Sequence, residues 1–301
     1  MNSSGNGASS LPLLDSRVPW AVRQLCYAAR SVPFYGRSLP LLASAVPSLR
    51  ETVIETDQCG PVCIDLRERV CIPLFVHGCY RHQTPQDRVL DALLKPGMTV
   101  FDVGANIGYY TAFFSRRVGA GRVVAVEPTN RAFRLLRRNS QLCNGDTLIM
   151  QAAIGSTPGI ASFHEQRNLD TSFVEFGKSG DSSSIAVRTI DELSREYGEP
   201  GLVKIDIEGA EIHALEGSAK TLSGANPPIV MIEYIASNAA RFGAYKLEAL
   251  LRHFPADTFL TYRVAAPGYL RNIGEDGADA TNDFLAVPRA KQFTIESLLR
   301  N

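Results

Sequence analysis

The stretch "TVFDVGANIGYYTAFF", residues 99–114, decides the fold. An apolar run ends at Asp102, a loop with Gly104 and Gly108 follows, and the residues after this loop have the pattern of a helix. A strand, a glycine-containing turn and a helix in this order are typical of the first unit of an open parallel sheet, whose turn cradles a small ligand. We therefore expect residues 104–108 to lie beside a cofactor.

The same alternation of strand and helix continues towards the C-terminus. The apolar runs "RVVAVE" and "GLVKIDI" are each followed by an amphipathic stretch, and so is "PPIVMIEYI". Because parallel strands need crossover connections, this order predicts a doubly wound, Rossmann-like α/β fold with helices on both faces of the sheet. Two later apolar runs, 257–264 and 282–288, could complete the sheet as an antiparallel pair.

Composition narrows the classes of function. The chain has 301 residues, 45% of them apolar, which is enough for a large domain or a medium domain with an extension. Lysine plus arginine and aspartate plus glutamate number 31 each, so the chain as a whole has no net charge that would attract nucleic acid or an anionic membrane. We see no basic stripe with interleaved aromatic residues either, and we expect neither partner.

The N-terminal part is expected to be an addition to the α/β domain. Residues 1–16 are polar and predicted to be disordered, and they lack the pattern of a secretory signal, so we expect a soluble cytoplasmic protein. Residues 17–84 form a helical and strand extension with helix-like stretches near 18–30 and 41–50, and its apolar helices could pair two subunits in a homodimer. The α/β domain is expected to span residues 85–301, beginning with a helix at "TPQDRVLDALLKPG".

Five of the six cysteines precede the glycine loop. Four of these, Cys59, Cys63, Cys71 and Cys79, could form a zinc site with His77 and His82 between residues 59 and 82, but none of the spacings is a C-x-x-C pair. Because "CGPVCIDLRERVCIPL" alternates like a strand, Cys63 and Cys71 are better explained as small apolar residues with reduced thiols.

The residues around the glycine loop discriminate between cofactors. A dinucleotide fingerprint needs glycine at positions 104, 106 and 109, but this chain has Asn106 and Tyr109. Asp102 would repel a pyrophosphate and would attract a ligand with ammonium and sulfonium charges, which describes S-adenosylmethionine. Glu127, at the end of the next strand, can accept hydrogen bonds from ribose hydroxyls. An NAD-dependent dehydrogenase is therefore the weaker alternative.

Several of these stretches occur in the order and spacing of a known family. With "VFDVGANIGYYT", "VVAVEP", "AAIGS", "LVKIDIEGAE" and "IVMIEY", residues 85–235 resemble the FkbM family of S-adenosylmethionine-dependent methyltransferases. The resemblance implies a class I methyltransferase fold with a mostly parallel, seven-stranded sheet, and O-methylation of a hydroxyl on a sugar, polyketide or other small molecule. The chain departs from the family at "GCYRHQTP", where such proteins often carry a Gly-x-Tyr-Glu-Pro-like segment.

The resemblance also implies a set of cofactor-binding residues. The methionine part would be held near Asp102, the ribose near Glu127 and the adenine near Ala152. The full predicted set is Asp102, Gly104, Ala105, Asn106, Gly108, Glu127, Pro128, Ala152 and Ala153.

Acids at the ends of two further strands are the candidate catalytic residues. In "LVKIDIEGAEIH", Lys204 and Asp206 share one face of the strand, and Asp206 should face the same edge as the glycine loop. Glu208 follows it, and Glu233 ends the next strand. An alcohol acceptor must lose a proton during methyl transfer, and a carboxylate can take it as general base. The candidates, in order of preference, are Asp206, Glu208, Glu233 and, last, His213, which is better explained as a packing residue.

Other interpretations stay open at this point. Glu211 suits the first turn of a helix as well as it suits a site. A metal is not required, although Asp206, Glu208 and Glu233 could together hold magnesium. A binding scaffold without turnover is also open. The polar region at 163–184 could contact the acceptor through several side chains, namely His164, Asn168, Asp170, Thr171 and Ser172.

Overall fold

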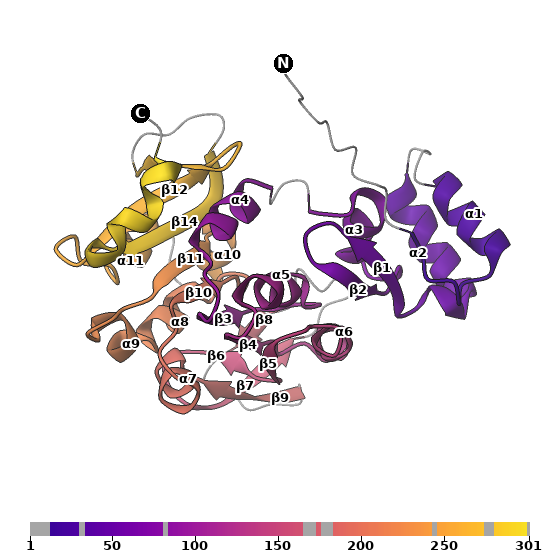
Figure 1. Cartoon of the computed structure of the whole chain (residues 1–301). Coiled ribbons are helices and arrows are strands. Elements are labelled where there is room, and N and C mark those ends of the chain that lie inside the picture. The colour runs from indigo at the N-terminus through magenta and orange to yellow at the C-terminus, as the bar shows by residue number, and fades with distance from the viewer. Residues whose placement is uncertain are drawn as a thin grey trace, which may run out of the picture. The chain divides into compact units, whose positions relative to one another are not determined.

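The structure is a computed structural model of the whole chain (Figure 1). It describes residues 13–29, 34–80, 84–164, 173–175, 183–242, 246–273 and 280–299. The chain divides into two compact units, residues 1–81 and 82–301, each described by itself. Among the helices of the described residues, none combines the length and the apolar character that crossing a bilayer requires.

The first unit consists of short helices and one hairpin. Its elements are α1 (Trp20–Ala29), α2 (Tyr35–Ala45), the 3-10 turn η1 (Pro47–Leu49), β1 (Thr52–Thr56), β2 (Gly60–Ile64) and α3 (Cys71–His77). The two strands pair antiparallel, and all six cysteines of the chain are present as thiols. Apolar side chains from the helices and both strands form the interior of this unit, which includes Cys26, Leu39, Ile54, Cys63 and Phe75.

Three expectations for this unit were wrong in detail. Leu14, expected in a disordered tail, is buried and forms a β-bridge with Ile54, and residues 1–12 of that tail lie outside the described residues. The second helix does not start after Pro40 but runs through it, because burial of Leu39 and Ala43 outweighs the lost backbone hydrogen bond. Cys71 begins a helix rather than continuing a strand.

The second unit alternates strands and helices. The helices and 3-10 turns are α4 (Thr84–Leu93), α5 (Tyr109–Val118), α6 (Asn130–Ser140), α7 (Ile190–Tyr197), α8 (Glu211–Glu216), α9 (Ala219–Ser223), α10 (Ala236–Ala239), η4 (Ala240–Phe242), α11 (Leu247–Leu251) and η5 (Arg289–Leu298). The strands are β3 (Thr99–Val103), β4 (Arg122–Val126), β5 (Asp146–Met150), β6 (Ala153–Ile154), β7 (Gly159–His164), β8 (Phe173–Glu175), β9 (Ser183–Arg188), β10 (Leu202–Ile205), β11 (Ile229–Glu233), β12 (Phe259–Ala265), β13 (Tyr269–Asn272) and β14 (Ala280–Pro288).

The central sheet has the order β13-β12-β14-β11-β10-β3-β4-β5. The five strands from β11 to β5 are parallel, and β14 runs antiparallel between β11 and β12. The strand order reverses between β3 and β10, and ligands of open α/β sheets bind at the carboxyl ends of the strands at such a switch point. Helices α5 and α6 lie on one side of the sheet, and α8 and α9 lie on the other (Figure 1).

The doubly wound α/β class and the antiparallel pair near the C-terminus are confirmed, with two additions. The described central sheet contains β13 beyond the expected seven strands. The region after β5, expected to be irregular, contributes a second sheet of order β6-β9-β7-β8, which a sequence of serines and glycines did not suggest. Its intervening residues 165–172 and 176–182 lie outside the described residues.

The main apolar core lies between the central sheet and the helices on its α8 side. It consists of alternate side chains of the parallel strands together with residues of α7, α8 and α11. Its members include Phe101, Val103, Val124, Val203, Ile205, Val230, Ile232, Ile190, Leu193, Ala214, Leu215 and Leu250. Apolar burial of this extent fixes the carboxyl ends of β3, β4, β10 and β11 relative to one another.

Candidate active site

The loop between β3 and α5 owes both of its glycines to packing. Gly104 has a φ of 83°, and a β-carbon there would lie 1.9 Å from the backbone oxygen of Asp206. Gly108 has a φ of 89°, and its β-carbon would lie 2.9 Å from Cδ1 of Leu136 in α6. Glycine is therefore needed so that this loop can approach the end of β10 and the side of α6.

Asp102 lies next to the end of β3 and is fully buried, with an exposure of 0%. The Thr111 hydroxyl donates a hydrogen bond of 2.7 Å to Oδ2, whereas Oδ1 has no partner among the described residues. Burial raises the pKa of Asp102, and the Lys204 charge and the Thr111 hydrogen bond act in the opposite direction. Asn106 lies in the same loop, and its buried Oδ1 also has no partner among those residues.

Glu127 is a buried loop-holding acid rather than a solvated strand-end carboxylate. The backbone N–H of Asn106 donates 2.8 Å to Oε2, and that of Thr129 donates 2.8 Å to Oε1. Burial raises the pKa of Glu127, against the lowering effect of these hydrogen bonds. A carboxylate has about four acceptor sites, so these contacts leave capacity for a hydroxyl ligand.

The side chains of the remaining predicted cofactor residues pack mainly against the protein, so these residues would contact a cofactor mainly through their backbone. Ala105 packs with Ala125 and Leu136 in a small apolar cluster. Ala152 belongs to the main core, and Ala153 starts β6 and packs with the second sheet. Pro128 follows Glu127 directly, and its backbone oxygen accepts a hydrogen bond from the Gln151 side chain. The methyl groups of Ala152 and Ala153 are therefore occupied by protein packing, and an adenine there would meet their backbone.

Lys204 is a buried cation, 1% exposed, at the centre of the acids. Its Nζ lies 2.9 Å from Oδ2 of Asp206 and 4.7 Å from the ring centre of Tyr110. Burial alone would lower the pKa of Lys204, but the charges of Asp206 and Asp102 outweigh it and raise this pKa. The lysine therefore stays charged, and a positive charge at this distance favours the carboxylate form of Asp206.

Asp206 and Glu233 come together at the ends of β10 and β11, as expected for acids of neighbouring parallel strands. The Asp206 side chain is 21% exposed. The Asp206 charge is the main cause that raises the pKa of Glu233 to about 9, followed by burial and by a hydrogen bond between the two carboxyl groups. At neutral pH Glu233 is thus protonated and donates to Asp206.

Glu208 and Glu211 shape the loop after β10. Glu208 has a φ of 57°, and Nδ2 of Asn238 donates 2.8 Å to its Oε2. Glu211 is buried and accepts the backbone N–H groups of Gly209 at 2.9 Å and Ile207 at 3.3 Å. Burial raises the pKa of Glu211 to about 7. Glu211 therefore fixes the loop, whereas Glu208 lies in the loop beside Asp206.

Four polar residues that the sequence did not single out join the same buried group. Gln86 and Asp87 come from α4, Tyr110 from α5 and Asp283 from β14. Nε2 of Gln86 donates 2.8 Å to Oδ1 of Asp283, and the Tyr110 hydroxyl lies 2.6 Å from Oε1 of Gln86 and 2.7 Å from Oδ1 of Asp87. The signal for Asp283 was an acid inside the apolar run "NDFLAVP", which a buried strand carries only where the acid has partners.

The other candidates stand apart from this group. His213 packs edge-on against Phe242 and lies 3.2 Å from Glu216, as a packing residue would. Across the described ranges, no group of three or more His, Cys, Asp or Glu side chains has the arrangement of a metal site. His164 is the last residue of β7, and Asn168, Asp170, Thr171 and Ser172 lie outside the described residues.

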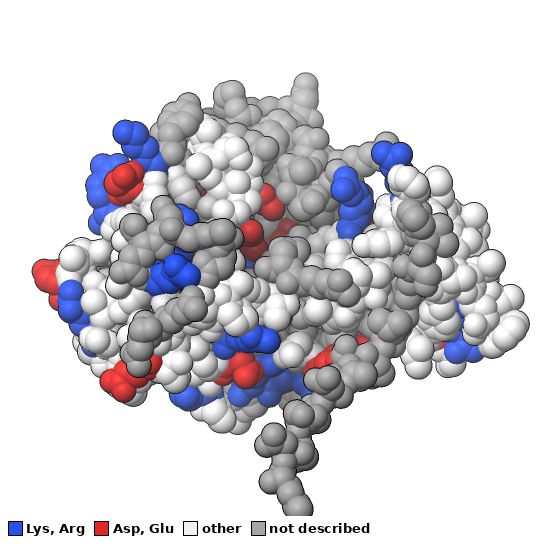
Figure 2. Space-filling view, turned by 90° about the horizontal axis from the view of Figure 1, so that it is seen from above, with Lys and Arg blue, Asp and Glu red and all other residues white. Residues whose placement is uncertain are grey.

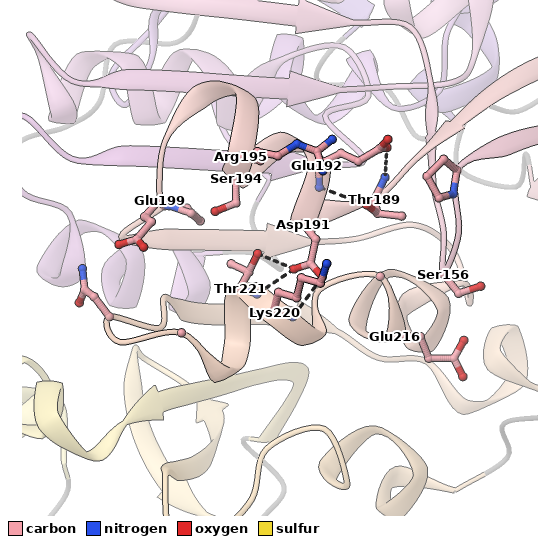
Figure 3. Close-up of a pocket in the computed structure, with 15 residues that line it drawn as sticks. Ser156, Thr189, Asp191, Glu192, Ser194, Arg195, Glu199, Glu216, Lys220 and Thr221 are labelled. Atoms are coloured by element: carbon pink, nitrogen blue, oxygen red, sulfur yellow. Dashed lines mark hydrogen bonds between the residues drawn. The ribbon is translucent and has the colours of Figure 1, made fainter.

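The surface around the site has mixed charge. Figure 2 shows acidic side chains recessed near the middle of the face seen from above, with basic and acidic side chains interspersed around the margin. A second hollow of about 570 Å³ lies elsewhere, beside α7 and α9 (Figure 3). Its polar groups are used as helix caps, with Thr189 and Glu192 forming a capping box and Asp191 accepting from Thr221. It contains none of the residues predicted to bind the cofactor.

The parallel strands and the reversal of strand order between β3 and β10 define a doubly wound α/β fold, the fold class that includes the class I methyltransferases. A model of the family described as the methyltransferase FkbM domain matches residues 102–264, which is more than half of the chain. The chain belongs to the FkbM methyltransferase family.

Similar proteins include a hexuronic acid methyltransferase, AglP, of Haloferax volcanii. It is 31% identical over 137 residues, which cover 44% of this chain and 55% of that protein, so the match spans about half of the relative's length. Among solved structures, an S-adenosylmethionine-dependent O-methyltransferase from Thermotoga maritima matches with a TM-score of 0.40 and 14% identity, covering 79% of this chain and 77% of that one. A precorrin-6y C5,15-methyltransferase from Geobacter metallireducens matches with a TM-score of 0.39 and 11% identity, covering 68% and 85%.

Proposed function

We propose that this enzyme is an S-adenosylmethionine-dependent O-methyltransferase that acts on a hydroxyl of a sugar or a similar small molecule. The observation that carries the cofactor assignment is a pair of buried acceptor atoms, Oδ1 of Asp102 and Oδ1 of Asn106, at the start of the glycine loop, for which the described residues provide no donor. A buried acceptor without a donor is costly, so a ligand that brings N–H donors is favoured there. An ammonium group meets this requirement.

The charges of the site also favour a cationic ligand. Asp102, Asp206 and Glu233 surround Lys204, and burial or mutual repulsion raises the pKa of Asp102 and of Glu233. When bound, S-adenosylmethionine would supply an electrophilic methyl group on a sulfonium sulfur. A negatively charged site stabilises such a positive charge and would repel a pyrophosphate, which argues against a dinucleotide.

Asp206 is the residue that we assign as general base. The Lys204 ammonium, at 2.9 Å, favours the ionised form of Asp206, and the Asp206 side chain is 21% exposed and so accessible to a substrate. In this role Asp206 would take the proton of the acceptor hydroxyl, and bound S-adenosylmethionine would supply the methyl group, leaving S-adenosylhomocysteine. Such proton transfer contributes about 10² to 10⁴ in rate. Glu208 lies in the same loop as Asp206 and accepts a hydrogen bond from Asn238 of α10. We assign Glu208 to binding of the acceptor.

The relative from Haloferax volcanii supports a sugar as the acceptor, since its name states a hexuronic acid. A sugar offers several hydroxyls, and acids beside the site can accept hydrogen bonds from them. Because the chain has no net charge, its overall electrostatic field does not favour an acidic polymer as the acceptor. We therefore include both neutral and acidic monosaccharides as acceptors to be tested.

The test is calorimetric titration of the whole chain with S-adenosylhomocysteine, with NAD in parallel. We expect saturable binding of S-adenosylhomocysteine alone, and weaker binding by Glu127→Gln, which keeps the shape of the side chain. Transfer of labelled methyl to hexuronic acid and hexose glycosides then tests the acceptor. Binding of NAD alone would overturn the proposal, and binding of S-adenosylhomocysteine without transfer to any hydroxyl would leave a binding scaffold in its place.

A further inference from the structure

Three acids stand side by side on three neighbouring strands. Glu233 is the register partner of Asp283 in the antiparallel pair β11–β14. On the other side, Ile232 pairs with Ile205 in the parallel pair β10–β11, so Asp206 follows as the neighbour of Glu233. We call Asp206, Glu233 and Asp283 the acid row. Side chains directly opposite in a sheet are about 5 Å apart, and like charges at that distance repel.

The two outer members of the acid row each have a donor that stabilises a charge. Lys204 lies 2.9 Å from Asp206, and the Gln86 amide donates 2.8 Å to Asp283. Gln86 is itself held in place, because its Oε1 lies 2.6 Å from the Tyr110 hydroxyl. Glu233, in the middle, has a carboxyl group on both sides. The arrangement therefore disfavours a charge on the middle member most strongly.

We infer that Gln86 and Asp283 are positioning residues that keep Glu233 protonated, so that Glu233 donates to Asp206 and Asp206 alone takes the proton of the acceptor hydroxyl. This inference rests on the proposed function for the role of Asp206, but not for the protonation of Glu233. In the transfer step, the proton moves from the hydroxyl to a carboxylate oxygen of Asp206, and Glu233 keeps its own proton throughout. Gln86 and Asp283 touch no reacting atom.

The charges that face Glu233 come from β10, from the residue after it and from β14. Lys204 lies on β10, Asp206 directly follows this strand and Asp283 lies on β14. Burial raises the pKa of Asp283 to about 6, with the Asp206 charge adding to it, so Asp283 is charged at neutral pH. The pKa of Glu233, at about 9, is raised by both of these carboxylates and lowered by Lys204. The row thus alternates as charged, neutral, charged.

The experiment is infrared difference spectroscopy of the whole protein over a range of pH, which reports the band of a protonated carboxylic acid. Glu233→Gln assigns the band by its loss. We expect the wild-type band to persist at neutral pH and to titrate near 9. In Asp283→Asn the midpoint should fall by about one pH unit or more, because a neighbouring charge is gone while the acceptor for Gln86 remains. Gln86→Leu should move the midpoint the same way, since an unsupported Asp283 takes up a proton more readily.

The matched control is Asp257→Asn, an exposed acid of the same unit that should leave the midpoint unchanged. A variant that loses only stability would lower the melting temperature without moving the band. An unchanged midpoint in both Asp283→Asn and Gln86→Leu, or a wild type without the band at neutral pH, would overturn the inference. S-adenosylhomocysteine titration of the same samples separates the two proposals, because a shifted midpoint without binding supports the acid row and refutes the cofactor.

Discussion

The loops after β3 and β10 are built alike and differ in one respect. Each contains a non-glycine residue with positive φ, Asn106 at 50° and Glu208 at 57°. In each, a buried glutamate accepts backbone N–H groups of the loop, Glu127 in the first and Glu211 in the second. The aspartates near the strand ends differ. Asp102 is fully buried, and its Oδ1 has no partner in the part of the chain that the structure describes, whereas the Asp206 side chain is partly exposed and paired with Lys204.

This difference indicates that Asp102 holds the ligand, whereas Asp206 takes part in the reaction. A buried acceptor without a donor suits a ligand group that stays in place throughout the reaction. If that ligand group moved during the reaction, the hydrogen bond to the acceptor would add little binding energy. An ionised, partly exposed carboxylate suits a group that must reach a substrate proton. The two loops therefore share a scaffold and divide the chemistry, and the following changes test that division in order of expected size.

The largest effect is expected where the two loops touch. Gly104→Ala would place a β-carbon 1.9 Å from the backbone oxygen of Asp206, at a φ of 83°. Since backbone cannot yield as a side chain does, we expect a loss of about 4 kcal/mol or more in the free energy of unfolding. Denaturant unfolding measures it. Gly159→Ala in β7, where nothing lies within 4 Å, is the control and should stay within about 0.5 kcal/mol.

Lys204→Met should remove the cation that serves both loops. The buried Asp102 and the partly exposed Asp206 would then lack a positive charge between them, which costs about 3 to 5 kcal/mol. The loss should shrink as the pH falls, because without Lys204 the folded-state pKa of Asp102 rises further above its unfolded value, and the folded state then binds the extra proton. Unfolding measured from acid to neutral pH tests this sign. A loss that grows on acidification would contradict the central place of Lys204.

Asp102→Asn addresses the holding loop alone. The change keeps the shape of the side chain but removes the charge, and we expect affinity for S-adenosylhomocysteine to fall by about 10- to 100-fold, the value of a hydrogen bond to a charged group. Calorimetry measures the affinity. The counterpart, Asp206→Asn, should bind S-adenosylhomocysteine with nearly unchanged affinity and lose turnover instead, and equal losses of affinity in both variants would erase the distinction between the loops.

The smallest effect is expected from Glu211→Gln in the reacting loop. Because burial raises the pKa of Glu211 to about 7, its contribution to stability is present at acid pH and is lost as the pH rises from about 4.5 to about 7. Glutamine can still accept from Gly209 and stays neutral, so the variant should lack this part of the pH dependence. The exposed acid variant Glu199→Gln should keep it. Parallel pH profiles for Glu211→Gln and the wild type would show that Glu211 does not titrate in the folded protein.

The parts of this fold that follow from local pattern were predictable. Short-range periodicity predicts the strand, turn and helix at 99–114 and the alternation of strands and helices along the chain. It also places Asp102, Asp206 and Glu233 near the ends of strands that share one edge of the sheet. The assignment of these acids to roles stays a prediction. The sequence did not show why Gly108 must be glycine, because the side chain that it packs against, Leu136, lies on another helix.

The parts that depend on distant neighbours were not predictable. Gln86 and Asp283 are separated by 197 positions, and each looks ordinary in its own segment, a polar residue on a helix and an acid in a strand. Pro40 predicted a helix boundary that the burial of Leu39 overrode. The strands β7 and β9 have a face of mixed residues, and only their mutual pairing makes them a sheet.

The position of β14 has a consequence for how the enzyme is made. This strand inserts between β11 and β12, and it carries Asp283. During synthesis, β11 therefore emerges long before its second neighbour, and its edge, with Val230, Met231 and Ile232, stays open to other strands in the meantime. When β14 pairs with β11, the nascent protein completes its acid row and covers this edge at the same time. We therefore expect an incompletely translated chain, which lacks β14, to have no complete acid row and to expose the edge of β11 to other strands.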